Sequence, residues 1–304
     1  MNFITKPDIS FIILVFNEEK TIGILLDLLA KLRNNYNIEI IVIDSGSYDK
    51  SIPIVLQKKE YVPEIKFYSI KQNEFNYAGT RNKAINLASG KYICFISADA
   101  LPINLNFLNF FLSDLKSHKK AVAVYGQQIP YKHTPLFINT EISCLFDKLN
   151  KHVNKEGVFI QKKNNLSNDP VFYAWFLSNV FACYKKSYLK KYPFPKTNNG
   201  AEDIKWAKMM IQKGYGIIYD SRCLVFHSHK LNFREYFLKQ KRDIELRQKH
   251  GQIKTNIWCK IRKALTSNDE LIRKAFFLID FFLCYATKIT TLLYINISRK
   301  WKNF

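Results

Sequence analysis

The chain has 304 residues, of which 47% are apolar, enough to fill the core of one large domain with or without an appendage. Aromatic residues make up 15% of the chain, which excludes a disordered or collagen-like protein. The formal net charge of +22 favours an anionic partner: nucleic acid, an acidic membrane surface or a phosphorylated substrate.

The first two-thirds of the chain alternates strand-like and helix-like segments, which predicts an α/β layered fold. Amphipathic helical segments follow the first two apolar runs, and another precedes Gly90. The predicted strands in this part are 10–16, 38–45, 65–70 and 91–99. Polar residues gather where these strands end, and open α/β sheets bind ligands at that edge. We therefore expect Asp44, Asp99 and the loop after Phe16 to surround one crevice.

A second block begins near residue 121 with the strand-like AVAVYGQQIP, followed by a helical pattern over 136–150. The polar stretch 155–170 predicts a loop, FYAWFLSNVFACYKKS is strand-rich, and AEDIKWAKMMIQKG predicts a helix that stops at Gly214. GIIYD and CLVFHSH are predicted to be two further short strands.

The character of the sequence changes near residue 231, where basic and aromatic residues accompany helical patterns. We therefore predict a domain over 1–230 and a basic amphipathic helical extension over 231–304. The extension either binds an anionic membrane surface or forms a helical cap on the domain with a solvated basic face. The apolar stretch 275–295 contains Asp280 and Lys288, so a packed or interfacial helix is favoured over a membrane span.

Six cysteines are scattered without any C-x-x-C pair, and several lie inside apolar runs. This pattern predicts reduced, packed thiols in a cytoplasmic protein and argues against a zinc or disulfide framework. The first ten residues lack a long apolar stretch, so no signal peptide is expected.

Two aspartates at strand ends are candidate ligand-binding residues. Asp99 follows an apolar strand in FISADALP, where a carboxylate could hold Mg²⁺ or Mn²⁺ against a diphosphate; the alternative is an ordinary turn or capping aspartate. Asp44, in VIDSGSYDKS, could accept hydrogen bonds from a nucleobase and ribose, or could serve only the local turn.

The candidate acid–base pair is Glu202 and Asp203, at a predicted helix start, where the helix dipole stabilises carboxylates. Asp203 could abstract a proton from an acceptor hydroxyl. His227 and His229 lie on one face if the strand before them persists, so either could reach a metal or diphosphate. Arg81 is a candidate phosphate anchor or a surface arginine.

Four ordered segments resemble family 2 glycosyltransferases, in particular bacterial rhamnosyltransferase-like members. The segments are FIILVFNEEKTIGILL, IIVIDSGSYDKS, FNYAGTRNKAINLASGKYICFISADALP and the stretch from SNVFACYKKS to CLVFHSH. The resemblance implies a GT-A fold, with a mixed sheet flanked by helices and a C-terminal helical extension. Two departures are Ser97, where the first acid of an Asp-x-Asp motif would stand, and Tyr77-Ala78, where related members show His-Gly.

The resemblance also assigns roles to residues. Asp203, with Glu202, looks like the catalytic base, and Asp99 with His227 or His229 looks like the Mg²⁺ or Mn²⁺ site. The implied contacts to a nucleoside-diphosphate sugar are Phe16, Asn17, Glu18, Asp44, Ser47, Arg81, Ser97 and Ala98.

The implied reaction is an inverting transfer of a sugar to a hydroxyl of a saccharide acceptor. We expect a lipid-linked acceptor in bacterial surface polysaccharide synthesis and a cytoplasmic enzyme peripheral to the inner face of the cell membrane. Donor sugar, linkage and oligomeric state are left open.

Competing interpretations are a sugar nucleotidyltransferase, a basic nucleic-acid-binding protein and a catalytically silent transferase. The first requires a Gly-rich phosphate loop where Phe16, Asn17 and Glu18 stand, and the second lacks a recognised binding module, so no nucleic acid partner is expected. Ser97 is the reason to consider the third.

Overall fold

The computed structural model describes residues 6–132, 134, 136–163, 175–197 and 200–228. The predicted C-terminal helices, the apolar stretch 275–295 and His229 lie outside these residues. The chain forms two compact units, one of residues 1–129 and 146–227 and the other of residues 130–145 and 228–304. The proposed domain boundary near residue 230 stays a prediction.

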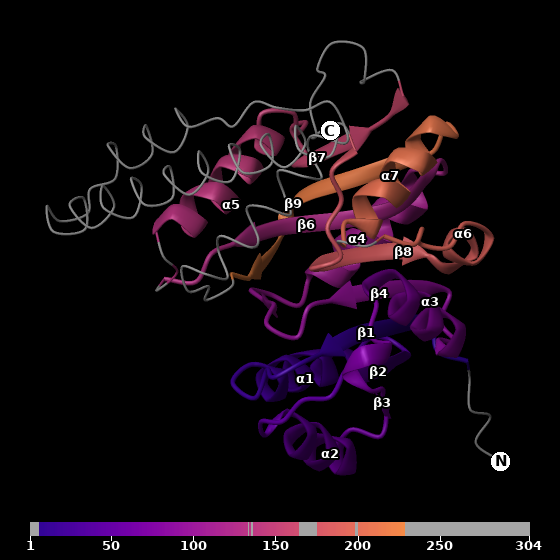
Figure 1. Ribbon diagram of the computed structural model, residues 1–304. Coiled ribbons are helices and arrows are strands. Elements are labelled where there is room, and N and C mark those ends of the chain that lie inside the picture. The colour runs from indigo at the N-terminus through magenta and orange to yellow at the C-terminus, as the bar shows by residue number, and fades with distance from the viewer. Residues whose placement is uncertain (1–5, 133, 135, 164–174, 198–199, 229–304) are drawn as a thin grey trace, which may run out of the picture. The chain divides into compact units, whose positions relative to one another are not determined.

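One mixed sheet organises the first unit (Figure 1). In the described residues it contains nine strands in the order β3-β2-β1-β4-β8-β6-β9-β5, with β7 paired to β9. The strands are β1 (Ile9–Val15), β2 (Ile38–Asp44), β3 (Ile65–Ser69), β4 (Tyr92–Ile96), β5 (Leu101–Pro102), β6 (Ala121–Ile129), β7 (Val158–Gln161), β8 (Phe181–Lys185) and β9 (Gly216–Phe226). The α/β layered architecture predicted from the sequence is confirmed.

Helices cover both faces of the sheet, which explains why its central strands are continuous apolar runs. The helices are α1 (Ile22–Ala30), α2 (Ser51–Tyr61), α3 (Tyr77–Leu87), α4 (Phe107–Ser117), α5 (Leu136–Asn150), α6 (Lys186–Lys191) and α7 (Glu202–Gln212). Two short 3₁₀ turns lie at Lys31–Asn34 and Gln72–Glu74.

Alternate residues of the strands divide the core into two layers. Phe11 of β1 and Cys94 of β4 pack with buried residues of α1 and α4 in one layer. In the other layer the rings of Phe95 and Tyr184 meet edge to face at 5.6 Å, and Tyr184 contacts Trp206 of α7 at 5.3 Å. A sheet buried on both faces leaves its edges for function.

Strand direction brings many chain segments to one edge. β2 and β4 both run parallel to β1, so the three strands end side by side. β8 is antiparallel to β4 and to β6, and β9 is parallel to β6. The carboxyl ends of β1, β2, β4, β6 and β9 and the start of β8 therefore share one edge of the sheet, which we call the carboxyl edge.

Three local expectations are wrong. The predicted loop over 155–170 contains β7, which pairs antiparallel with β9. The two predicted short strands near residue 220 are one strand, β9, in which a bulge shifts the register between Gly126 and Gln127 of β6. Cys94, Cys183 and Cys223 are free and buried as expected, but Cys144 is disulfide-bonded.

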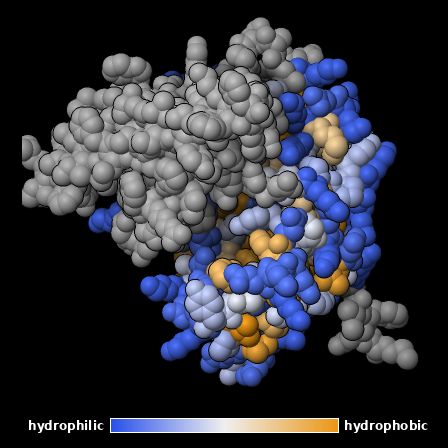
Figure 2. Space-filling model, viewed as in Figure 1, coloured by the Kyte–Doolittle hydropathy of each residue, from blue (hydrophilic) through white to orange (hydrophobic). Residues whose placement is uncertain are grey.

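The visible described surface is mostly hydrophilic, with small hydrophobic patches (Figure 2). Within the part of the chain that the structure describes, no helix combines the length and the apolar character that crossing a membrane demands.

Candidate functional site

Asp44, the last residue of β2, closes a tight turn at the carboxyl edge. Its Oδ2 accepts hydrogen bonds from the backbone N–H of Gly46 at 2.8 Å and of Ser47 at 3.1 Å. Its side chain is buried, being 1% exposed. The structure therefore shows the local turn role, while contact with a nucleobase stays a prediction.

The loop after β1 interlocks with this turn. Asn17, with a left-handed φ of 55°, donates its backbone N–H to Ser47 Oγ at 2.9 Å and accepts from the Tyr48 N–H at 3.0 Å through Oδ1. The Glu18 N–H donates to Ser51 Oγ at 2.7 Å. The left-handed conformation, which Asn tolerates better than most residues, explains why Asn stands there. Sequence-predicted residues from two segments are thus brought together.

Two aromatic side chains stand open beside this loop. Phe16 is 38% exposed and meets the ring of Tyr48, which is 85% exposed, edge to face at 6.0 Å. Exposed rings next to a polar turn can stack against a planar ligand such as a nucleobase. The sequence analysis named Phe16 and missed Tyr48, whose only signal was an aromatic residue in the turn after a strand.

Asp99 and His227, which are far apart in the sequence, meet at the carboxyl edge. His227 Nε2 lies 3.5 Å from Asp99 Oδ2, and both side chains are largely buried. The other ring nitrogen, Nδ1, is 2.9 Å from Gln128 Oε1. An amide oxygen only accepts, so Nδ1 carries a proton, and Nε2 is the ring nitrogen that faces Asp99.

This pair fits a divalent cation. A lone pair and a carboxylate oxygen at this separation repel each other unless a proton or a metal ion lies between them. Adjacent ligands of an octahedral ion at about 2.1 Å lie about 3 Å apart, close to the observed 3.5 Å. Within the described residues, no group of three or more His, Cys, Asp or Glu could hold a metal. A cation here would therefore need oxygen ligands from a substrate, as Mg²⁺ commonly does.

Ser178 and Asn179, just before β8, connect the two halves of the site. Gln128 Nε2 donates to Ser178 Oγ at 3.0 Å, while the Asn179 backbone N–H donates to Asp203 Oδ2 at 2.9 Å. A continuous series of contacts thus runs from Asp99 to Asp203. These two acids, which are far apart in the sequence, are thus linked through a few side chains, while their convergence on one substrate groove stays a prediction.

Glu202 is held by two hydrogen-bond donors in a buried position. Arg81 Nη1 of α3 forms an ion pair with Glu202 Oε1, and Asn179 Nδ2 donates to the same oxygen at 3.2 Å. Arg81 also lies over the rings of Tyr77 and Phe95, at 5.3 and 5.7 Å. The guanidinium is thereby fixed against Glu202.

The environment of Asp203 suits a proton acceptor. Burial, and then the adjacent Glu202 carboxylate, raise the pKa of Asp203 from 3.8 to about 6. The Asn179 N–H, Arg81 and the Ile204 N–H act in the opposite direction, but burial outweighs them. A carboxyl group tuned toward neutrality and fixed at a helix start can accept a proton near pH 7.

Two other predicted site residues, Ser97 and Ala98, have simpler surroundings. Ser97, at the end of β4, donates its backbone N–H to the Val180 carbonyl at 3.0 Å, next to Asn179. The side chain of Ala98 packs in the core and is 3% exposed, so only its backbone could meet a nucleotide. The proposed metal role of His229 falls outside the described residues.

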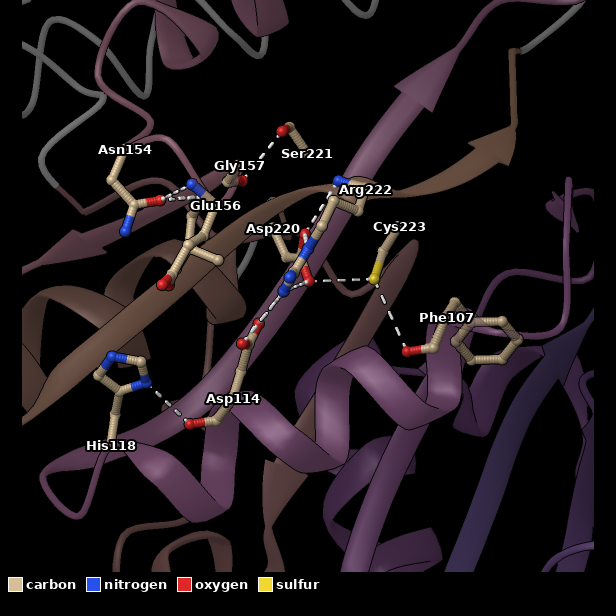
Figure 3. Close-up of polar contacts among 11 residues, drawn as sticks. Phe107, Asp114, His118, Asn154, Glu156, Gly157, Asp220, Ser221, Arg222 and Cys223 are labelled. Carbon is tan, nitrogen blue, oxygen red and sulfur yellow. Dashed lines mark hydrogen bonds and ion pairs between the residues drawn. The ribbon is translucent and has the colours of Figure 1, made fainter.

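A second charged cluster lies at the β9 bulge and was not predicted (Figure 3). Arg222 donates to the buried Asp220 through Nη2 at 2.8 Å and reaches Asp114 of α4 at 3.2 Å. Burial, and then Asp220, raise the pKa of Asp114 to about 7. Because Arg222 connects α4 to the bulge of β9, we assign this cluster a structural role.

Comparison with known proteins agrees with the geometry. Residues 10–185 match the model of Glycosyl transferase family 2. The O-antigen chain rhamnosyltransferase RfbN of Salmonella typhimurium is 32% identical over 213 residues, 68% of this chain and 62% of its own length. The O-antigen chain rhamnosyltransferase WbaN of Salmonella anatum is 34% identical over 208 residues, 67% of this chain and 61% of its own. The chain thus matches about three-fifths of each relative.

Solved structures show the same architecture. The mannosyltransferase PcManGT from Pyrobaculum calidifontis, in complex with GDP-Man and Mn²⁺, superposes with a TM-score of 0.56 at 17% identity, covering 97% of this chain and 76% of its own. TarS residues 1–349 of S. aureus, in complex with UDP-GlcNAc, give 0.54 at 18% identity, covering 90% of this chain and 71% of their own.

The fold is thus the GT-A fold of these glycosyltransferases. More particularly, the chain belongs to glycosyl transferase family 2.

Proposed function

We propose that this chain transfers a sugar, with inversion, from a nucleoside-diphosphate sugar to a hydroxyl of a saccharide acceptor in surface polysaccharide synthesis. The observation that carries this proposal is the contact series from Asp99 through His227, Gln128, Ser178 and Asn179 to Asp203. The series supports the proposal because it links Asp99 and His227, the proposed cation-binding pair, to Asp203, the proposed proton acceptor, and a direct displacement needs both close to one substrate. The names of the two Salmonella relatives support a polysaccharide acceptor.

Asp203 is the proposed catalytic base. It removes the proton of the acceptor hydroxyl while that oxygen attacks the anomeric carbon from the face opposite the departing nucleoside diphosphate. Asn179 fixes Asp203 Oδ2 through its backbone N–H. Glu202 raises the proton affinity of Asp203. Arg81, whose guanidinium is engaged with Glu202, is assigned to positioning that residue, in place of the predicted phosphate anchor.

Asp99 and His227 are the proposed protein ligands of Mg²⁺ or Mn²⁺. Gln128 fixes the tautomer of His227 through Nδ1, as groups around metal-binding histidines commonly do. When bound, the cation would neutralise charge that develops on the diphosphate leaving group. Phe16, Tyr48 and the Asp44 turn are proposed to receive the nucleotide.

The test combines donor binding with turnover. A panel of UDP-, dTDP- and GDP-sugars with and without Mn²⁺ should contain one donor that raises the melting temperature, because a ligand of the folded state stabilises it by mass action. Asp203→Asn should keep that shift but lose at least about a hundredfold in turnover. Asp27→Asn, at an exposed side chain of α1, is the matched control. A panel without any stabilising donor, or equal turnover by both variants, would reject the proposal.

A peripheral location at an anionic membrane, with a lipid-linked acceptor, is part of the proposal. It is supported by the net charge of +22 and by the basic sequence after residue 231. Sedimentation with anionic liposomes at low salt, compared with a chain ending near residue 230 as long as that chain remains folded, tests the role of the extension. Equal sedimentation of both chains would remove the extension from the proposal.

A further inference from the structure

A cavity of about 840 Å³ opens at the opposite, amino edge of the sheet. Its walls come from the segment before β1, the turn between α3 and β4, the end of α4 and the start of α6. Seven of its 14 lining residues are lysines, and one, Asp8, is acidic. Its volume is typical of small-molecule sites, about 300–1,000 Å³, but those sites are mostly apolar. A lining of this kind selects an anion.

The charges in this lysine cavity are not neutralised by carboxylates. Within the described residues, none of its seven ammonium groups forms an ion pair. Lys186 Nζ donates to the Ala88 carbonyl oxygen, and Lys185 Nζ donates to the Lys119 carbonyl oxygen at 3.3 Å. Neutral acceptors orient these ammonium groups but leave their charge available to a ligand.

The lysines also repel one another. Burial, followed by the charges of Lys6 and Lys190, lowers the pKa of Lys186, although Glu39 acts in the opposite direction. Burial, followed by Lys91, lowers the pKa of Lys185. An anion bound in the cavity would relieve this repulsion. Anion binding would therefore explain why so many lysines lie together here.

One wall of the cavity is fixed in advance. The buried Glu39 carboxylate accepts hydrogen bonds from the N–H groups of Ser89 and Gly90 and from Ser10 Oγ, which hold the turn before β4. A Cβ at Gly90 would lie 2.7 Å from the Ser10 backbone nitrogen, so the turn depends on glycine. A preorganised wall lowers the ordering cost of ligand binding.

We propose that the lysine cavity binds an anion carrying more than one phosphate group, at a site separate from the catalytic edge. The two sources of that chemistry are a soluble molecule with two or more phosphates and the headgroup of a phospholipid with two phosphates. Because the cavity lies at the amino edge, such an anion would be held while the catalytic edge stays open to donor and acceptor. The inference therefore goes beyond the proposed transfer reaction and does not depend on it.

The test uses the full chain and a triple substitution on the cavity rim, Lys91→Gln with Lys116→Gln and Lys119→Gln. These lysines are exposed, and their ammonium groups form no hydrogen bond within the described residues, so the fold should survive. The matched control removes three exposed lysines elsewhere in the same way, at Lys59, Lys151 and Lys155.

Calorimetry with inorganic pyrophosphate, without divalent cations, measures the soluble source. Vesicles of phosphatidylcholine with and without cardiolipin, whose headgroup carries two phosphates, measure the headgroup source. In one arm or both, the rim variant should bind about tenfold more weakly than the control, with binding that weakens as salt rises. The responding arm identifies the source.

A second variant, Asp99→Asn, distinguishes binding at the lysine cavity from binding at the donor site. Pyrophosphate binding at the lysine cavity should persist in Asp99→Asn, whatever becomes of turnover. Binding that disappears in Asp99→Asn and persists in the rim variant would belong to the donor site and overturn the proposal. Equal binding by the rim variant and its control in both arms would also overturn it. Without ligand, the rim variant should melt no lower than the control, because it has lost like-charge repulsion.

Discussion

The pH dependence of turnover is the sharpest test of the candidate base. Only the carboxylate form of Asp203 can accept the acceptor proton, and burial beside Glu202 raises its pKa from 3.8 to about 6. About nine-tenths of the enzyme would be competent near pH 7 and about one-tenth near pH 5, since each unit below the pKa costs about tenfold. The rate at saturating donor should therefore fall about tenfold between those pH values.

The neighbours of Asp203 make the direction of change testable. Glu202→Gln removes the charge that raises the pKa of Asp203, so the acid limb of the profile should move to lower pH. Arg81→Gln removes a charge that lowers the same pKa, so the limb should move to higher pH. The two partners of one ion pair are thus expected to shift the acid limb of the pH profile in opposite directions when each is substituted.

The assay is steady-state turnover from about pH 5 to about pH 8, with melting temperatures for each variant at each pH. Those melts matter because breaking a buried ion pair commonly costs about 3–5 kcal/mol. Asp203→Asn should show a flat residual rate. Acid limbs that stay in place, or that move in the same direction in both folded variants, would refute the assignment of Asp203 as the base.

Further predictions concern the metal pair, the bulge and the cluster at β9. Gln128→Met should weaken the apparent affinity for Mn²⁺ about tenfold, measured as the metal dependence of turnover, because it removes the acceptor that orients His227; unchanged metal dependence would count against that role. Gly126→Ala should cost about 1–3 kcal/mol of unfolding free energy, because a Cβ there would lie 2.4 Å from the Cys223 carbonyl oxygen. Gly79→Ala, where a Cβ would meet no atom closer than 3.6 Å, should instead stabilise its helix. Similar urea midpoints for both variants would contradict this reasoning. Asp114, with a folded-state pKa raised to about 7, retains a proton that the unfolded chain has lost, so its stabilising contribution is complete below about pH 4 and disappears as the pH rises to about 7. Asp114→Asn should accordingly gain melting temperature relative to the wild type over that range, and parallel curves would show that Asp114 does not titrate as proposed.

Local pattern predicted the first half of the fold well. The first three predicted strands, at 10–16, 38–45 and 65–70, differ from the observed strands by about one residue at each end. These strands are parallel, and β1 and β2 are buried along almost their whole length, so both are mostly apolar with polar residues following them. The edge strand β3 is only partly buried and includes the exposed Lys66. The same regularity revealed Asp44 and Asp99, because strand direction alone sends both to the carboxyl edge.

The second half was harder because its strands pair over long distances. β7 lies in a polar stretch and exists through its pairing with β9, while the two-residue β5 exists through its pairing with the far end of that strand. The β9 bulge was mistaken for a break between two strands, since Asp220 and Arg222 interrupt the apolar pattern. The two side chains pair with each other inside the sheet, and Arg222 also reaches Asp114.

The residues that assemble the site are the ones the sequence revealed least. Gln128 lies in no recognised motif, and Ser178 and Asn179 open a resembling segment without any role assigned to them, yet all three connect the proposed metal pair to the proposed base. The positions of Ser178 and Asn179 follow from β8, which lies antiparallel between β4 and β6. The residues just before β8 therefore lie at the edge where the neighbouring strands end. An acidic residue that follows a predicted strand can be identified from the sequence. The neutral side chains that position its partners can be identified only when the strand order is known.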